Sequence, residues 1–185
     1  VIICDYNYAF DPRVFLRRFL LEDGGDYAFL IDEAHNLVDR AREMFSGEVF
    51  KQPILDVRRA VHRQLPLIYK SLGKINAWML RARKKCAQVG EERHENAPPE
   101  DLIPLLRTFL ITTENWLTRN IKTPFREALL DLYFQIAGFV RVAEQFDDSY
   151  VTCFAQHKTD LKVKLFCIDP SIQLNTALKR CKAAV

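Results

Sequence analysis

Two acidic residues and a histidine stand together directly after a short apolar run. The tetrapeptide Asp32-Glu33-Ala34-His35 follows residues 27–31, Tyr-Ala-Phe-Leu-Ile. Many nucleoside triphosphatases present the ligands of Mg²⁺ on such a strand end, because this ion takes one or two carboxylates and keeps several waters. Asp32 is therefore predicted to hold the metal through water, and Glu33 to orient or deprotonate the water that attacks the γ-phosphate of ATP. Ligands of open α/β sheets bind at this carboxyl end of the strands.

His35 lies too far along the chain to ligate the same metal easily. We expect it to hydrogen-bond a polar group from a second lobe and so to couple hydrolysis to motion. The alternative for the whole tetrapeptide is a surface helix that happens to begin with acidic residues, which the helix dipole favours. The apolar strand before it favours the functional interpretation.

The sequence lacks the other half of such a site. A triphosphatase also needs a glycine-rich loop that cradles the phosphates, and no such loop occurs in the 185 residues. The chain begins with Val1-Ile2-Ile3, as if in the middle of a strand, and ends at Val185 as if another strand were starting. We therefore expect a piece of a longer protein that does not hydrolyse ATP alone.

Residues 51–85 carry a strong local excess of positive charge. They hold ten Lys or Arg residues and one acidic residue, Asp56, although the whole chain has a net charge of only +3. Because neutralising phosphates drives nucleic-acid affinity, this stretch is the predicted contact for single-stranded DNA. The residues assigned to that contact are Arg58, Arg59, Arg63, Arg81, Arg83, Lys84 and Lys85. Lys70 and Lys74 lie in the same helix, and the alternative for every one of these residues is an ordinary solvated helix face.

A second predicted DNA contact lies near the start of the chain. Tyr6, Asn7 and Tyr8 form a polar and aromatic turn after an apolar run, and such a turn is suited to stack on a base or to bind a phosphate. The alternative is that Tyr8 or Phe10 packs in the core.

The pattern of apolar residues divides the chain into three parts. Residues 1–48 are predicted to hold strands at 1–4 and 27–31 and helices at about 11–21 and 36–45, as in a parallel sheet covered on both faces. Residues 49–148 are predicted to be a helical insert. Residues 149–185 are predicted to form a β-hairpin, 150–155 with 161–168, followed by a helix at about 172–182.

The insert is predicted to be built from long antiparallel helices. Apolar residues from Ile54 to Met79 recur every three or four positions, and Pro66 should kink or split that helix. Residues 90–99 are polar and predict a loop. Further helices are expected at about 99–119 and 123–146, with Thr123 as the N-cap of the last. The predicted fold is mostly α, with this insert carried on a small α/β piece and a hairpin.

Composition excludes some classes of protein. No run approaches the roughly 18 apolar residues of a membrane span, and residues 1–5 do not resemble a secretory signal. The five cysteines include no C-x-x-C pair, so we expect reduced thiols in a cytoplasmic protein rather than a disulfide framework or a zinc site.

Both ends of the chain resemble one family. Residues 1–12 and 29–38, the latter Phe-Leu-Ile-Asp-Glu-Ala-His-Asn-Leu-Val, resemble the iron–sulfur DEAH helicases of the XPD/DinG type in superfamily 2. Residues 165–171 and 177–185 resemble the stretch that leads into the Ser-Ala-Thr motif of that family. The helical middle agrees in position with the Arch domain of the family.

The resemblance implies a segment of a bacterial, ATP-dependent DNA helicase that moves 5′ to 3′ and serves repair or processing of damaged or structured DNA. Residues 1–48 and 149–185 would belong to motor lobe 1, and residues 49–148 to an Arch that guides single-stranded DNA or docks a protein partner. Mg²⁺ and ATP would be cofactors of the full-length protein. Its nucleotide-binding loop, its iron–sulfur cluster and its second motor lobe would lie outside this chain, and none of the five cysteines here matches a cluster ligand. The alternative is a non-enzymatic helical module that docks protein or DNA.

Overall fold

The computed structural model describes residues 1–22, 26–119 and 121–185. The chain forms two compact units. Unit 1 contains Val1–Ser46 and Phe166–Val185, and unit 2 contains Gly47–Leu165. The fold is mixed, with helices, a four-stranded antiparallel sheet and a two-stranded parallel sheet.

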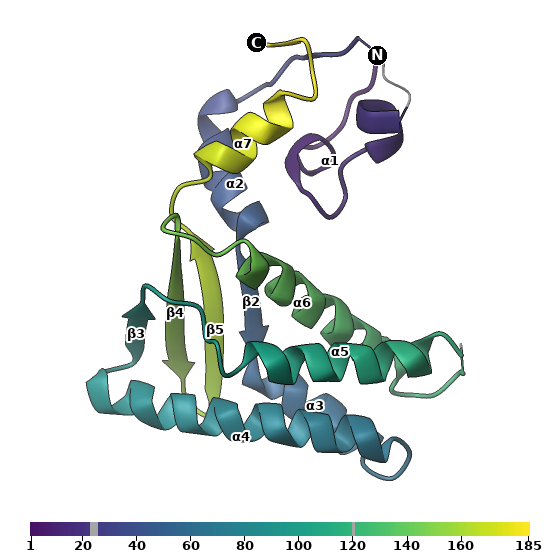
Figure 1. The fold of residues 1–185 in the computed structure, drawn as a ribbon, viewed down its shortest axis with the longest axis vertical. Coiled ribbons are helices and arrows are strands. Elements are labelled where there is room, and N and C mark those ends of the chain that lie inside the picture. Colours follow the sequence, from purple (N-terminus) through teal and green to yellow (C-terminus); the bar gives the residue numbers. More distant parts are fainter. Residues whose placement is uncertain (23–25, 120) are drawn as a thin grey trace. The chain divides into compact units, whose positions relative to one another are not determined.

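The antiparallel sheet belongs to unit 2 and is ordered β2-β5-β4-β3 (Figure 1). Its centre is the predicted hairpin, formed by β4 (Tyr150–His157) and β5 (Asp160–Cys167). Lys158 takes a positive φ of 54° in the turn between them. The sequence predicted that this hairpin belongs with the returning segment 149–185, but the structure places it, up to Leu165, with the helices of unit 2.

Two outer strands complete the sheet, and the sequence pattern predicted neither. β2 (Gly47–Phe50) pairs with β5, and β3 (Glu92–Glu95) pairs with β4. The prediction that residues 90–99 form only a loop is therefore wrong. The four residues of β3 are all polar, and their pairing with β4 determines the strand where no apolar alternation marks it.

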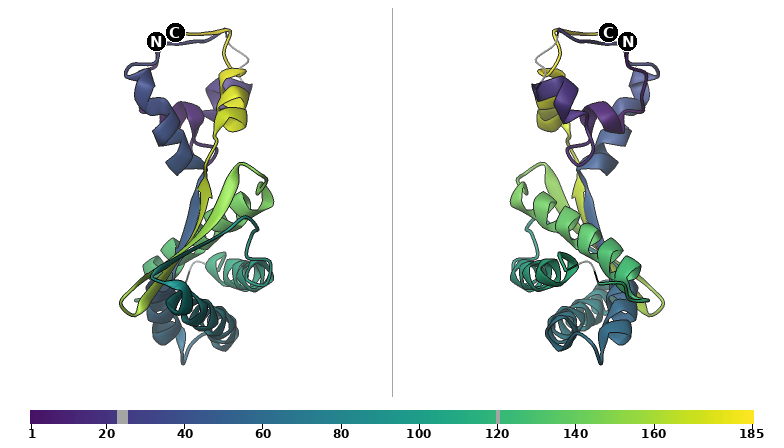
Figure 2. Two further views of the ribbon diagram at one scale, coloured as in Figure 1. Left: turned by 90° about the vertical axis from the view of Figure 1, so that its left-hand side faces the viewer. Right: turned by 90° about the vertical axis from the view of Figure 1, so that its right-hand side faces the viewer.

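Four helices pack beside this sheet. They are α3 (Lys51–Val61), α4 (Pro66–Val89), α5 (Ile103–Leu117) and α6 (Arg126–Glu144). Pro66 splits the first long helix as predicted and occupies the first turn of α4, where its missing N–H is not needed. The colours of Figure 1 show α4 and α5 running in opposite directions, and Figure 2 shows them side by side, nearly end-on. The N-cap of α6 is Phe125 and not Thr123, so that prediction is wrong.

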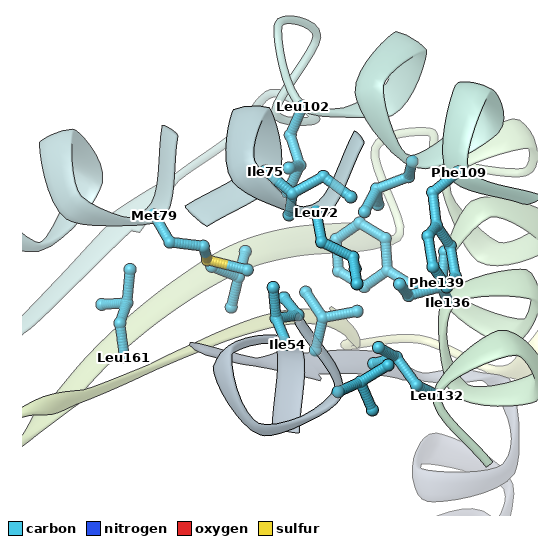
Figure 3. Packing of buried hydrophobic residues seen from close by; sticks show 14 of the residues in the cluster. Ile54, Leu72, Ile75, Met79, Leu102, Phe109, Leu132, Ile136, Phe139 and Leu161 are labelled. Carbon is cyan, nitrogen blue, oxygen red and sulfur yellow. The ribbon is translucent and has the colours of Figure 1, made fainter. Parts of the chain in front are cut away.

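The predicted apolar stripes form the core of unit 2. Figure 3 shows side chains from α3, α4, α5, α6 and β5 that meet in one cluster. Ile54, Ile75, Phe109 and Ile136 are each fully buried in it. Trp78 and Trp116 are half-buried and pack against the same cluster.

Gly47 allows β2 to approach α6 closely. A Cβ at this position would lie 3.0 Å from the Cα of Phe139 and 3.2 Å from a methyl carbon of Val142. The first of these contacts is with backbone, which cannot move aside as a flexible side chain can. The absence of a side chain at residue 47 is therefore a condition of this packing.

Unit 1 consists of short elements. α2 (Leu37–Phe45) agrees with the predicted helix, and α7 (Ser171–Leu178) is a shorter form of the predicted last helix. The expected helix at 11–21 is wrong over most of its length: residues 11–16 are not helical, and only a single π-helical turn, Arg18–Glu22, lies at the end of that range. A short helix, α1 (Asn7–Phe10), precedes it. The predicted strand at 1–4 is also absent from the described structure, where Val1 and Ile3 are exposed instead of being covered by a partner strand.

A small apolar cluster holds unit 1 together. Phe10, Leu37, Met44 and Ala177 are its buried members, so it draws on α1, α2 and α7. In the described part of the chain, no helix is both long enough and apolar enough to cross a bilayer.

Candidate functional site

The acidic tetrapeptide follows a parallel strand pair in unit 1. β1 (Ala28–Phe29) pairs in parallel with β6 (Ala183–Ala184), and further bonds run from Ile31 N–H to Val185 O (2.8 Å) and from Lys182 N–H to Tyr27 O (2.8 Å). The parallel pairing agrees with the prediction for residues 27–31. Leu30 is exposed, so the expectation of a strand covered on both faces is wrong for the described residues.

Asp32 and Glu33 lie in a tight turn at the carboxyl end of β1. Glu33 adopts a left-handed conformation with φ 51° and ψ 40°. Asp32 Oδ1 accepts a hydrogen bond from the Glu33 N–H (2.9 Å), and the Glu33 carbonyl accepts one from the Asn36 N–H (2.9 Å). A short 3₁₀ turn, Ala34–Asn36, then leads into α2. The backbone of the turn is thus bonded on both sides of Glu33.

His35 pairs with Glu33 across this turn. Its Nδ1 lies 3.3 Å from Glu33 Oε2, and both side chains are more than half exposed. The sequence prediction directed His35 toward a second lobe, and in this chain its described partner is the acidic residue two positions before it. An exposed pair of this kind contributes little to stability, so either side chain can turn to another partner at small cost.

Asp32 fits the role of a water-mediated Mg²⁺ ligand. Its side chain is exposed, and Oδ1 is the carboxylate oxygen that binds the Glu33 N–H. Magnesium bound with a nucleotide takes most of its ligands from phosphates and water, so a single carboxylate suffices on the protein side. Within residues 1–22, 26–119 and 121–185, no group of three or more His, Cys, Asp or Glu side chains could hold a metal by itself.

Tyr6 contacts the same turn from a distant part of the sequence. Its hydroxyl donates to the carbonyl oxygens of Asp32 and Glu33, the latter at 3.0 Å. Tyr6 was predicted to contact DNA together with Asn7 and Tyr8, and no pattern in the sequence indicates this bond. Asn7 and Tyr8 lie in α1 with exposed side chains, whereas Tyr6 is half-buried.

The structure divides the predicted basic contact into two groups. Arg58 and Arg83 have partners inside unit 2. The guanidinium of Arg58 lies 4.2 Å from the ring centroid of Tyr69 and donates to its hydroxyl (2.9 Å). Arg83 donates to the carbonyl oxygen of Thr159 (2.7 Å). These two arginines therefore hold elements of unit 2 together.

The remaining basic residues point into solvent. Arg59 pairs with Asp56 (3.2 Å), and Arg63 is exposed in the connection between α3 and α4. On α4, the exposed basic residues are Lys70, Lys74, Arg81, Lys84 and Lys85.

These last five residues form a single stripe, here called the α4 basic stripe. With about 3.6 residues per turn their positions span an arc of about 100° on the helix. From Lys70 to Lys85 the stripe is about 22 Å long. The sequence of α4 contains no acidic residue, and none of the five makes an ion pair with any residue that the structure describes. Their charges are therefore available to an external anion.

Neither a scan against protein-family models nor a search of curated proteins found a match for this chain.

Proposed function

We propose that this chain is a segment of an ATP-dependent DNA helicase of the XPD/DinG type, with unit 1 contributing to ATP hydrolysis and unit 2 binding single-stranded DNA. The observation that carries the proposal is the position of Asp32 and Glu33. Both carboxylates are exposed at the carboxyl end of a parallel strand, which is where open α/β sheets bind their ligands.

Each residue of the tetrapeptide then has a role in the full-length protein. Asp32 would hold Mg²⁺ through water, and the ion would neutralise charge on the phosphates of ATP. Glu33 would accept a proton from the attacking water or orient it. His35, released from its exposed pair with Glu33, would bond a polar group of the second motor lobe.

The remaining parts of the machine are proposed to lie in other segments of a bacterial, cytoplasmic protein. The nucleotide-binding loop, the iron–sulfur cluster and the second lobe would come from there, and movement from 5′ to 3′ follows from analogy with the family. Unit 2 would be the Arch of this helicase.

The α4 basic stripe supports the assignment of DNA to unit 2. Five cations, without an ion-pair partner among the described residues, extend along about 22 Å of helix and provide a row of contacts for successive phosphates. Such contacts carry no sequence information, as suits an enzyme that must move along its substrate. Asn7 and Tyr8 remain candidates for a second contact because their side chains are exposed.

A second candidate function is a docking platform without catalysis. Ile111 on α5 and Phe134 on α6 are both 64% exposed, although each belongs to a helix that packs in the core. Isolated exposed apolar residues are common, so the acidic turn and the basic stripe favour the helicase.

Substitution Glu33→Gln in the full-length protein tests the proposal. The amide keeps the size of the side chain but cannot accept a proton, so ATP turnover should fall by about 100-fold or more while ATP still binds. Turnover would be measured by phosphate release and binding by a fluorescent ATP analogue. Glu43→Gln on α2 is the matched control and should leave turnover unchanged. Retained turnover in Glu33→Gln would remove Glu33 from its role.

A further inference from the structure

We propose that Tyr6 is a positioning residue that fixes the backbone of Glu33 for ATP hydrolysis, an inference that rests on the proposed function. The sequence suggested a DNA ligand at this position. The structure instead directs the hydroxyl of Tyr6 to the backbone of the acidic turn, where it can act on the reaction only through Asp32 and Glu33.

The contact joins two segments that are far apart in the sequence. Tyr6 donates to the carbonyl oxygens of Asp32 and Glu33, 26 and 27 residues away. A phenol has one proton, so the two carbonyls share it. The ring of Tyr6 packs against the apolar cluster of unit 1, which anchors the side chain while its hydroxyl reaches the turn.

The residue that Tyr6 holds has an unusual backbone. Among the described residues other than glycine, only Glu33 and Lys158 have a positive φ, and Lys158 lies in an ordinary hairpin turn. A glutamate in the left-handed region persists only where its surroundings hold it there. Such conformations cluster at sites where geometry is part of the mechanism.

Three groups hold the backbone of Glu33, and two of them are local. Asp32 Oδ1 binds its N–H, and the Asn36 N–H binds its carbonyl oxygen. The Tyr6 hydroxyl is the third and, among the described residues, the only one from outside residues 32–36. Without that hydroxyl the Glu33 carbonyl is held only from within the turn, and the direction of the Glu33 carboxylate is less well fixed.

A small loss of alignment has a large effect on a group that activates water. A displacement of about 1 Å can reduce a rate by about 100-fold. Loss of the hydroxyl should therefore lower kcat and leave the KM for ATP unchanged, because Tyr6 bonds to the backbone of the turn and not to the carboxylates that would hold the metal and orient the water. A residue that contacted DNA would instead change the affinity for DNA.

The first experiment compares Tyr6→Phe with Tyr27→Phe in the full-length helicase. Both remove only a hydroxyl from a half-buried ring in unit 1, and that of Tyr27 has no hydrogen-bond partner among the described residues. For Tyr6→Phe we expect kcat with saturating single-stranded DNA to fall by about tenfold or more, with unchanged KM for ATP and unchanged Kd for DNA. Tyr27→Phe should match the wild type.

The second experiment uses this chain alone and does not depend on catalysis. Exchange of the Asn36 amide, measured by NMR, should be several times faster in Tyr6→Phe than in the wild type or in Tyr27→Phe. Faster exchange is expected because the Asn36 amide donates to the Glu33 carbonyl oxygen, which in Tyr6→Phe no longer receives the hydrogen bond from the Tyr6 hydroxyl.

The outcomes separate this inference from the proposed function. An unchanged kcat in Tyr6→Phe, or weaker DNA binding with full kcat at saturating DNA, would overturn the positioning role. Unaltered exchange of the Asn36 amide would show that the Tyr6 hydroxyl does not support the backbone of the turn. A wild-type full-length protein without ATP turnover would overturn the proposed function and with it the positioning role of Tyr6 in ATP hydrolysis. The exchange experiment could still confirm the hydrogen bond from Tyr6 to the turn.

Discussion

The guanidinium of Arg58 on α3 is stacked on the ring of Tyr69 on α4 and bonded to its hydroxyl. The chain breaks between these two helices just before Pro66. Arg58 precedes the break and Tyr69 follows it, so this pair joins the end of α3 to the start of α4. Arg58 therefore contributes to the packing of unit 2 and not to an open cationic surface.

Substitution Arg58→Met should destabilise unit 2 by about 1–2 kcal/mol, because it removes a stacked cation and a hydrogen bond. Arg59→Met, on the same helix with an exposed side chain, should cost less than about 0.5 kcal/mol. Urea denaturation followed by circular dichroism would measure both. Equal stabilities of the two variants would contradict a structural role for Arg58.

Neutralising the α4 basic stripe should weaken binding of single-stranded DNA. Lys70, Lys74, Arg81, Lys84 and Lys85 would be replaced together by Gln. The slope of log K against log salt should become shallower by about 0.7 for each phosphate that the protein no longer neutralises. Fluorescence anisotropy with a labelled oligonucleotide at several salt concentrations would measure the slope.

The control for the stripe carries the same change in charge elsewhere on unit 2. Its five exposed residues are Arg107, Arg119, Lys122, Arg141 and Lys158. If the position of the charge matters, this control retains most of the affinity. An equal decrease in both variants would show that only net charge attracts the DNA, and no binding by the wild-type chain at low salt would remove the stripe as a DNA contact.

Two glycines on neighbouring elements should respond to alanine in opposite directions. Gly47→Ala places a methyl group 3.0 Å from the backbone of α6 and should cost about 1–3 kcal/mol. Gly138→Ala, within α6 and with no atom within 4 Å of the new Cβ, should stabilise the chain by about 0.5–1 kcal/mol. Thermal unfolding would distinguish the two. A stabilising Gly47→Ala would show that β2 and α6 are not packed as described.

The five thiols should react with iodoacetamide in an order set by burial and ionisation. Cys4 is exposed and should react first, whereas Cys86 and Cys167 are fully buried and should react only on unfolding. Burial raises the pKa of the half-buried Cys153 thiol, with Lys164 opposing that effect and Glu92 adding to it. Its thiolate therefore forms at higher pH than in a free cysteine, whose pKa is about 8.5.

Labelling of Cys153 should thus remain slow near neutral pH and increase as the pH rises through its raised pKa. Mass spectrometry of peptides after timed labelling would follow each thiol, and Cys153→Ser would identify its peptide. Native labelling of Cys86 as fast as that of Cys4 would contradict the described packing of α4 against β4.

The sequence predicted those parts of the fold that rest on apolar periodicity. The stripes of α4, α5 and α6 are long enough to show a helical repeat, and Pro66 marks a break for a local reason. β3 could not be predicted in this way, because Glu92-Arg93-His94-Glu95 forms a strand through its pairing partner. The apolar run of residues 1–4 led to the opposite error: it has strand composition, but no described strand pairs with it.

The candidate sites show the same division between local and long-range information. Asp32 and Glu33 could be selected because the strand before them is their immediate neighbour in the sequence. Arg58 and Arg83 look like any other basic residues in the sequence. Their internal partners, Tyr69 and Thr159, lie 11 and 76 residues further on. The bond from Tyr6 to the acidic turn likewise joins residues 26 and 27 positions apart, and no sequence pattern over that distance predicts the contact.

The register of the sheet gives unit 2 a topological property. Its first residue, Gly47, is the direct pairing partner of its last, Leu165, so the two points where the chain enters and leaves are neighbouring positions on adjacent strands. Paired antiparallel residues have Cα atoms only about 5 Å apart, a gap that a two-residue turn can close. Unit 2 is thus inserted into the chain at one point. It could be deleted or exchanged for another domain as a whole, with the flanking segments joined by a two-residue turn.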